Sequence, residues 1–176
     1  MHHVLKGRGN AYLVSAGDHH LLVDTGMKSS FRRLGQTING LLPKNKTLDF
    51  LVLTHTHYDH CQSATKIQEK ENCRVVLGQA ESAYAQKGYA PLPRRTSLMP
   101  RLLTGIGNLM GRGAFGYAAF GIFRNTIFPP FADNTRRLIQ SWKKLLDTPC
   151  HTFLPGHGGP ITRKMLEKEY RHRSKR

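Results

Sequence analysis

The sequence has few cysteines, few acidic residues and no long apolar run. Its three cysteines, Cys61, Cys73 and Cys150, form no Cys-x-x-Cys pair, which excludes a disulfide framework and indicates a reducing compartment. The N-terminus lacks the apolar core of a signal peptide. The longest uncharged stretch of the basic middle, residues 113–123, is about half the length that a bilayer requires. We therefore expect a soluble cytoplasmic protein without a membrane span, and we interpret each cysteine as a small buried residue.

Acidic charge is scarce, because 11 Asp and Glu stand against 27 Lys and Arg and leave a formal net charge of +16. A basic surface attracts nucleic acid, anionic lipid or acidic small molecules. The sequence has no aromatic-interleaved RNA motif, zinc finger or glycine-rich phosphate loop. The alternative explanation of the net positive charge is a solvated basic face together with a frayed C-terminal tail. The expected partner is a small-molecule substrate, anionic if this surface contributes, and nucleic acid is an alternative that only the charge supports.

The length and the apolar patterning indicate one α/β domain. With 176 residues and 39% hydrophobic content, we predict a single domain over residues 1–165 and a basic C-terminal tail over residues 166–176. Periodicity predicts strands at residues 10–15, 20–24, 49–54, 73–78 and 150–154, and helices at residues 28–41, 63–71, 81–87 and 138–146, with a basic helix and tail from residue 163. The order strand, loop, helix, strand between residues 49 and 78 is typical of a βαβ unit.

Two features of the middle of the chain are less regular. Residues 98–119 carry apolar side chains at helical spacing with glycines between them. This pattern leaves open a flap over the site, a membrane-touching face or a partner-binding face. Asp133 precedes the apolar pattern of residues 138–146, and we interpret it as the cap of that helix.

The densest group of metal-ligand side chains is the motif of residues 55–60, directly after the predicted strand 49–54. Three imidazoles and one carboxylate fall within these six residues. Because side chains two residues apart in an extended chain point to the same side, His55 and His57 can converge on one metal ion. Asp59 and His60 follow as the chain turns away and can face a second ion. The pattern therefore predicts a metal site, against the alternative of a polar loop with scattered histidines.

The pattern His-x-His-x-Asp-His after an apolar strand resembles the signature of the metallo-β-lactamase-fold hydrolases. Residues 9–14 and 20–26 resemble the opening hairpin of that family, which ends in an Asp-Thr-Gly turn, and residues 153–158 resemble its late Pro-Gly-His-Gly element. The three stretches occur in the family's order. The resemblance implies an α/β (α+β) fold, a metallo-β-lactamase-like αββα sandwich that is incomplete in its second half, and metal-dependent hydrolysis.

The resemblance also implies a role for individual residues. His55 and His57 would hold a first metal ion, while Asp59, His60 and His157 would hold a second. Asp59 is also the expected catalytic residue. Glycines on both sides of His157 permit the tight loop that presents it. The expected cofactor is zinc, with one or two ions bound, and iron or manganese are alternatives.

Asp24 occupies a position that, in the family, supports the metal loop from behind the ligands. Hydrogen bonds of this kind orient the side chains that touch the metal. A plain turn role for Asp24, before Thr25 and Gly26, fits the sequence almost equally well.

Two parts of the family pattern are missing. Family members usually carry a third histidine for the first ion and a metal-bridging aspartate between the motif and the late histidine. This chain has no histidine between His60 and His151 and no aspartate between Asp59 and Asp133. The resemblance therefore implies that a hairpin is absent, with the join near residues 120–121. An exposed sheet edge would follow, and with it pairing into a homo-oligomer.

Three functions follow from these observations. The leading hypothesis is a zinc-dependent hydrolase in which activated water attacks an ester, thioester, lactone or phosphodiester. The second is a shortened homologue that is catalytically inactive or only binds metal. The third, favoured by charge alone, is a protein that processes or binds nucleic acid.

Overall fold

The computed structural model describes residues 1–88, 127 and 134–175. The chain divides into two compact units, Met1–Leu92 and Pro93–Arg176. The interrupted helical pattern of residues 98–119, the join near residues 120–121 and the predicted cap Asp133 lie outside the described residues. Among the helices that are described, none is long and apolar enough to cross a membrane.

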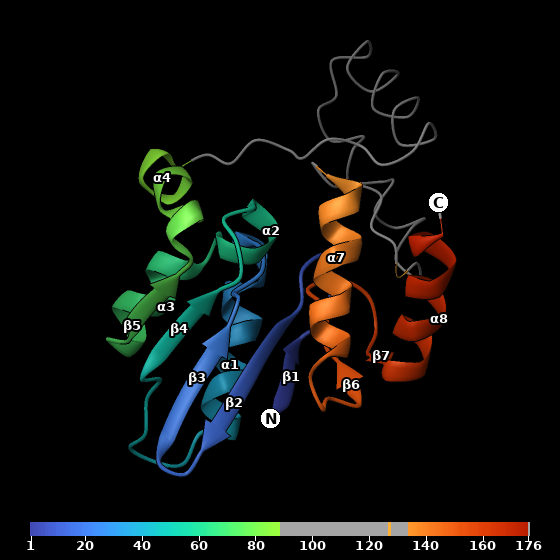
Figure 1. Ribbon diagram of the computed structural model, residues 1–176. Helices are drawn as coiled ribbons and strands as arrows, with labels where there is room; N and C mark the ends of the chain where they lie inside the picture. The colour runs from blue at the N-terminus through green and yellow to red at the C-terminus, as the bar shows by residue number, and fades with distance from the viewer. Residues whose placement is uncertain (89–126, 128–133, 176) are drawn as a thin grey trace. The chain divides into compact units, whose positions relative to one another are not determined.

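The first unit is built on a five-stranded sheet whose strands lie in sequence order (Figure 1). Its strands are β1 (His2–Leu5), β2 (Ala11–Ala16), β3 (His19–Val23), β4 (Phe50–Leu53) and β5 (Arg74–Leu77). β1, β2 and β3 pair antiparallel, whereas β4 and β5 extend the sheet in parallel. Because parallel neighbours require crossover connections, helices separate β3 from β4 and β4 from β5.

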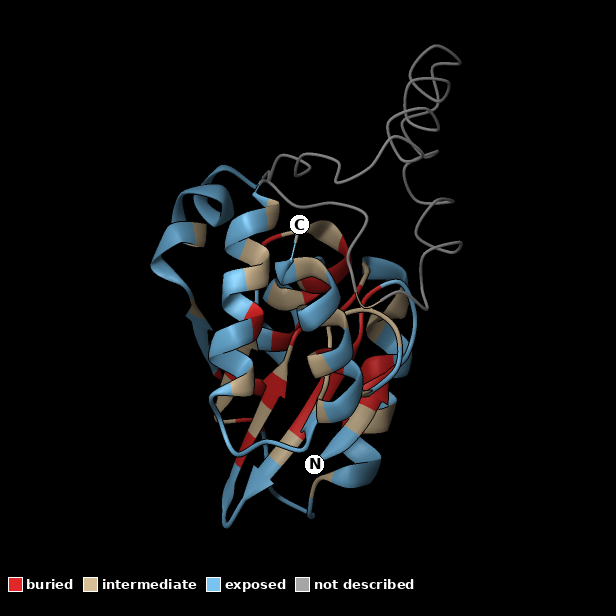
Figure 2. Cartoon of the chain, turned by 45° about the vertical axis from the view of Figure 1, so that its right-hand side comes forward, coloured by how far each residue is buried: buried red, intermediate tan, exposed pale blue. Residues whose placement is uncertain are grey.

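The crossover helices add buried side chains to the core that the strands form. The 3-10 turn η1 (Lys28–Ser30) leads into α1 (Phe31–Leu41), while α2 (Tyr58–Cys61) and α3 (Ala64–Glu71) join β4 to β5, which α4 (Gln79–Lys87) follows. Leu34 and Ile38, four residues apart on α1, are completely buried, as is Ile67 of α3. They share one core with Leu22 of β3 and Leu51 of β4. Figure 2 shows the buried positions concentrated on the strands and on the helix faces turned toward them.

The described part of the second unit, residues 134–175, contains two helices and a short hairpin. Its elements are α7 (Thr135–Leu146), β6 (Thr152–Phe153), β7 (Ile161–Thr162) and α8 (Arg163–Ser174). α7 and α8 contact each other, and among the described residues of this unit Trp142 and Leu166 are the buried apolar side chains. The Thr162 hydroxyl caps α8 by accepting a hydrogen bond from the Met165 amide at 3.3 Å.

Within the described residues, the structure confirms the predicted alternation of strands and helices and corrects several details. β1, the single-turn helix α2 and β7 were not predicted, because each is too short to show a periodicity. The cap of α7 is Asn134 and not Asp133: the Asn134 side chain accepts a hydrogen bond from the Arg137 amide at 3.0 Å. Cys73 is buried as expected, but Cys150 is exposed, since it precedes the edge of a two-stranded hairpin instead of facing a core.

Gly26 tests how closely β1 packs against the turn after β3. Its φ of +69° lies in the left-handed region, and a Cβ added there would lie 2.2 Å from Cδ2 of Leu5. We expect Gly26→Ala to lower the free energy of unfolding by about 1–2 kcal/mol or more, because alanine is strained in this conformation. Urea denaturation followed by circular dichroism measures the change.

Gly40 provides the matched control for this substitution. It is exposed near the end of α1, and a Cβ there would meet nothing within 4 Å. Because alanine is the better helix former, Gly40→Ala should leave stability unchanged or raise it by about 0.5–1 kcal/mol. Equal losses of unfolding free energy in the two variants would contradict the close packing of Leu5 on Gly26.

Candidate metal centre

The candidate ligands follow the end of β4, and Asp24 holds this end of the strand in place. Asp24 is 1% exposed and has a φ of 59°, a conformation uncommon for residues other than glycine. Its backbone amide donates to the Val52 carbonyl at 2.8 Å. Its Oδ1 accepts from the Thr54 amide and its Oδ2 accepts from the Thr54 hydroxyl, both at 2.8 Å. The carboxylate at the end of β3 thus holds the first residue after β4 by both backbone and side chain.

The same carboxylate orients His60. His60 is completely buried, and its Nδ1 lies 2.8 Å from Oδ2 of Asp24. Because a carboxylate only accepts, Nδ1 carries the proton and the lone pair of the neutral ring is on Nε2. Nε2 lies 4.0 Å from Oδ2 of Asp59. The ring therefore presents its unprotonated nitrogen beside the Asp59 carboxylate, a second candidate ligand.

Backbone contacts hold His60 as firmly as its ring. The Thr25 amide and hydroxyl both donate to the His60 carbonyl, at 2.7 and 3.0 Å. Asp59 and His60 lie on α2, whose first turn is closed by the His60 amide donating to the His57 carbonyl at 2.9 Å. A Cβ on Gly9 would lie only 2.0 Å from the Asp59 carbonyl oxygen. The segment before β2 therefore packs directly on the turn that carries Asp59.

His55 and His57 lie together, as their spacing predicts. Their ring centroids are 4.6 Å apart, and the His55 ring lies 4.1 Å from that of His60. The Thr54 hydroxyl gives its proton to Asp24 and so accepts from Nδ1 of His55 at 3.0 Å, which leaves the lone pair of this ring on Nε2 as well.

Protonation of His55 is strongly disfavoured. Burial lowers its pKa to about 4, and repulsion from His60 and His57 adds to this effect. The neutral imidazole is the form that binds a metal ion. His55 is therefore neutral near neutral pH, which is the form that a metal ion requires.

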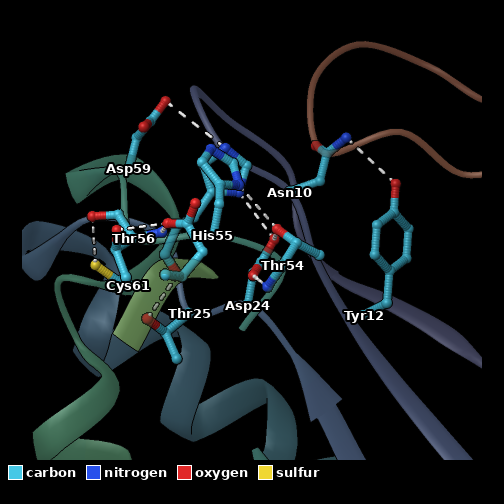
Figure 3. A network of polar contacts seen from close by, with 11 residues as sticks. Asn10, Tyr12, Asp24, Thr25, Thr54, His55, Thr56, Asp59 and Cys61 are labelled. Atoms are coloured by element: carbon cyan, nitrogen blue, oxygen red, sulfur yellow. Dashed lines mark hydrogen bonds and ion pairs between the residues drawn. The ribbon is translucent and has the colours of Figure 1, made fainter. Parts of the chain in front are cut away.

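Figure 3 shows this network from close by, with Asp59 and Asp24 on opposite sides of the imidazole rings. Thr54 lies beside Asp24, and Thr56 and Cys61 lie next to each other on the far side of the loop. The Cys61 thiol donates to the Thr56 carbonyl at 3.2 Å, and burial raises the pKa of this thiol. Cys61 thus serves the loop as a packing and hydrogen-bonding residue.

One carboxylate next to the motif was not predicted. Oε2 of Glu81, on the first turn of α4, accepts hydrogen bonds from the Thr56 amide at 2.9 Å and from the Thr56 hydroxyl at 2.7 Å. Burial raises the pKa of Glu81, but the bonds from Thr56 outweigh it and bring the pKa below its ordinary value. The available signal was topological: parallel β4 and β5 end at the same edge of the sheet, so the helix after β5 begins next to the loop after β4.

His157 lies in the second unit, in the loop between β6 and β7. It is half-buried, and Gly158 after it has a φ of +78°, which only glycine adopts without strain. The first unit thus brings together Asp24, His55, His57, Asp59 and His60. The role of His157 as a ligand stays a prediction.

The comparisons with known proteins identify the family of this chain. The family profile of the metallo-beta-lactamase superfamily matches residues 5–161. The chain is 30% identical over 81 residues to a "probable metallo-hydrolase" of Methanocaldococcus jannaschii, which covers 45% of this chain and 37% of that protein. It is 32% identical over 71 residues to a "Beta-lactamase-like protein 2 homolog" of Drosophila melanogaster, which covers 38% and 24%. The aligned part is thus well under half the length of either relative.

Solved structures include two similar metallo-beta-lactamases. BJP-1, a subclass B3 enzyme of Bradyrhizobium japonicum, has 24% identity and a TM-score of 0.43, covering 47% of this chain and 31% of that one. SMB-1 has 22% identity and a TM-score of 0.43, covering 51% and 35%.

The family match spans every stretch that carried the resemblance. It includes the hairpin that ends at Asp24, the motif of residues 55–60 and the loop of His157. The α/β architecture expected from the sequence is the one observed in the sheet and helices of the first unit. This chain belongs to the metallo-β-lactamase superfamily.

Proposed function

We propose that this chain is a metal-dependent hydrolase whose ion is held after β4. The observation that carries the proposal is the double role of the Asp24 carboxylate, which fixes the His60 ring and the Thr54 hydroxyl at 2.8 Å each. These bonds place the ring protons of His60 and His55 on Nδ1, so that Nε2 is the nitrogen that would coordinate a metal ion. The donor set, three imidazoles and the buried Asp59 carboxylate, is one that suits zinc, with iron or manganese as alternatives.

The ligands divide into two groups. His55 and His57 supply two nitrogens for a first ion, while Asp59, His60 and His157 supply three ligands for a second. Three protein ligands and one open position are typical of catalytic zinc. The second group is therefore the one that we expect to bind metal most firmly. Family membership and the Pro-Gly-His-Gly loop support the assignment of His157.

The chemistry that fits this centre is attack of water on an ester, thioester, lactone or phosphodiester. A bound zinc ion supplies Lewis acidity, which polarises the scissile group and lowers the pKa of a coordinated water. The chain's own contribution is orientation and proton handling. Asp24 holds His60 and Thr54 in place, and the Asp59 carboxylate would accept the proton that the attacking water loses. The excess of basic residues favours an anionic substrate.

Metal binding without turnover is the second candidate. The specific observation is that no histidine lies between His60 and His151 and no aspartate between Asp59 and Asp133. The first ion then has two protein ligands instead of the three usual for catalytic zinc. In this case the chain binds zinc through the second group but catalyses no hydrolysis.

Hydrolysis assays separate these candidates. The zinc-loaded chain is expected to cleave at least one of four chromogenic substrates: bis(p-nitrophenyl) phosphate, a p-nitrophenyl ester, a thioester or a lactone. His60→Ala should reduce the rate at least about hundredfold, because it removes a ligand and the group that Asp24 orients. Bound zinc with no activity on any substrate would support the second candidate, and a chain that takes up no zinc would contradict both.

The two late histidines give a sharp test of the ligand assignment. His157→Ala should weaken zinc affinity at least about hundredfold, since one ligand of three is lost. His151, which is exposed before β6, is the matched control, and His151→Ala should retain the affinity of the parent chain. Competition with a chromogenic chelator measures both constants. Full zinc affinity in His157→Ala would disprove the second site as assigned.

Gly9 tests the link between the N-terminal segment and the ligand turn. Because a Cβ at Gly9 would lie 2.0 Å from the Asp59 carbonyl oxygen, Gly9→Ala must displace α2. We expect zinc affinity to fall by about tenfold or more and stability to fall by about 1–3 kcal/mol. Chelator competition and thermal unfolding provide the two measurements.

The control lies two residues earlier in the same segment. A Cβ at Gly7 would meet only the Gly9 carbonyl oxygen, at an ordinary 3.9 Å. Gly7→Ala should therefore keep both zinc affinity and stability. Indistinguishable behaviour of the two variants would show that Gly9 does not shape the site.

A further inference from the structure

Glu81 contacts the metal loop but is not one of the candidate ligands. It lies on the first turn of α4, one βα unit after the motif. β4 and β5 are parallel neighbours, with Leu53 paired to Leu77 at their ends. The loop after β4 and the helix after β5 therefore begin at the same edge of the sheet, and this topology brings Glu81 to Thr56.

Thr56 is held through three of its polar groups. Its amide and its hydroxyl donate to Oε2 of Glu81, at 2.9 and 2.7 Å, and its carbonyl accepts from the Cys61 thiol at 3.2 Å. Thr56 is 8% exposed, so these bonds lie largely out of water, where an unmet amide would be costly. The residue between His55 and His57 is thus fixed from both sides.

The contact with Glu81 holds the residue that lies between the two histidines. His55 and His57 flank Thr56, and their ring centroids are 4.6 Å apart. His57 is also the residue that precedes α2. A shift of the Thr56 backbone would therefore move both imidazoles and the start of the turn that carries Asp59 and His60.

We propose that Glu81 is a positioning residue, which holds the Thr56 backbone so that His55 and His57 converge on one cation. The role rests on the proposed function, since it presumes that these histidines bind metal. It matters most in this chain because no histidine lies between His60 and His151 to support the first ion. With two protein ligands, affinity depends strongly on how rigidly the pair is held.

Two substitutions at Glu81 separate positioning from charge. Glu81→Ala removes both bonds to Thr56. Glu81→Gln keeps an amide oxygen, which can accept both bonds as Oε2 does, but removes the negative charge. Glu69→Gln, an exposed carboxylate on α3, is the matched control.

The first measurement is hydrogen exchange of the Thr56 amide in the metal-free protein, followed by NMR. We expect Glu81→Ala to speed this exchange about tenfold or more, while Glu81→Gln restores most of the protection and Glu69→Gln leaves it unchanged. Unchanged protection in Glu81→Ala would overturn the contact itself. If this variant does not fold, Thr56→Val, which deletes only the hydroxyl bond, provides the same test from the other partner.

The second measurement is zinc and cobalt(II) affinity of the same variants by chelator competition. We expect an affinity about 10- to 100-fold lower in Glu81→Ala, as for other residues that orient ligands, with most of it recovered in Glu81→Gln. If Glu81→Ala keeps the full metal affinity of the parent chain, Glu81 only joins α4 to the loop and does not position the histidines. An equal loss in Glu81→Gln, with Thr56 protection restored, would assign the effect to charge and overturn positioning.

These results also separate this inference from the proposed function. A parent chain that takes up neither zinc nor cobalt overturns the proposed function, whatever the Thr56 amide does. A parent chain that binds zinc, with Glu81→Ala binding it equally well, overturns the role of Glu81 alone.

Discussion

The first unit depends on one buried carboxylate, Asp24. It lies at the end of β3 in a left-handed conformation and bonds to the residue after β4 and to the ring of His60. A buried carboxylate without such partners would be costly, so the strand end, the loop and the α2 turn are held in one arrangement. The same bonds set the tautomers of His60 and, through Thr54, of His55. The bonds that join the end of β3 to the loop after β4 are thus the same bonds that orient the candidate ligands.

The sheet topology explains why the functional residues gather at one edge. β3, β4 and β5 are parallel and end on the same side, where ligand sites of α/β sheets lie. Asp24 follows β3, the histidine motif follows β4 and Glu81 follows β5. Three consecutive connections therefore supply a carboxylate that orients His60, the candidate ligands themselves and a carboxylate that holds the loop.

The sequence predicts the elements with strong local patterns and misses the contacts that arise between distant segments. The motif of residues 55–60 and the strand before it were recognisable because ligand spacing and apolar runs are local signals. The choice between an orienting role and a plain turn role for Asp24 needed its bond to His60, 36 residues away. Glu81 and Gly9 carry no local pattern and became visible only once the topology placed them against the loop. The prediction that Cys150 is buried was wrong, because the short hairpin that follows it has no buried face.

The central claim is that this arrangement of imidazoles and one carboxylate holds a metal ion. X-ray absorption spectroscopy of the zinc-loaded chain tests it most directly, because it reports the type and distance of the ligand atoms. The account predicts at least one bound zinc per chain with nitrogen and oxygen neighbours at about 2.0–2.2 Å and no sulfur. A chain that retains no zinc after dialysis, or a zinc with sulfur neighbours at about 2.3 Å, would contradict it.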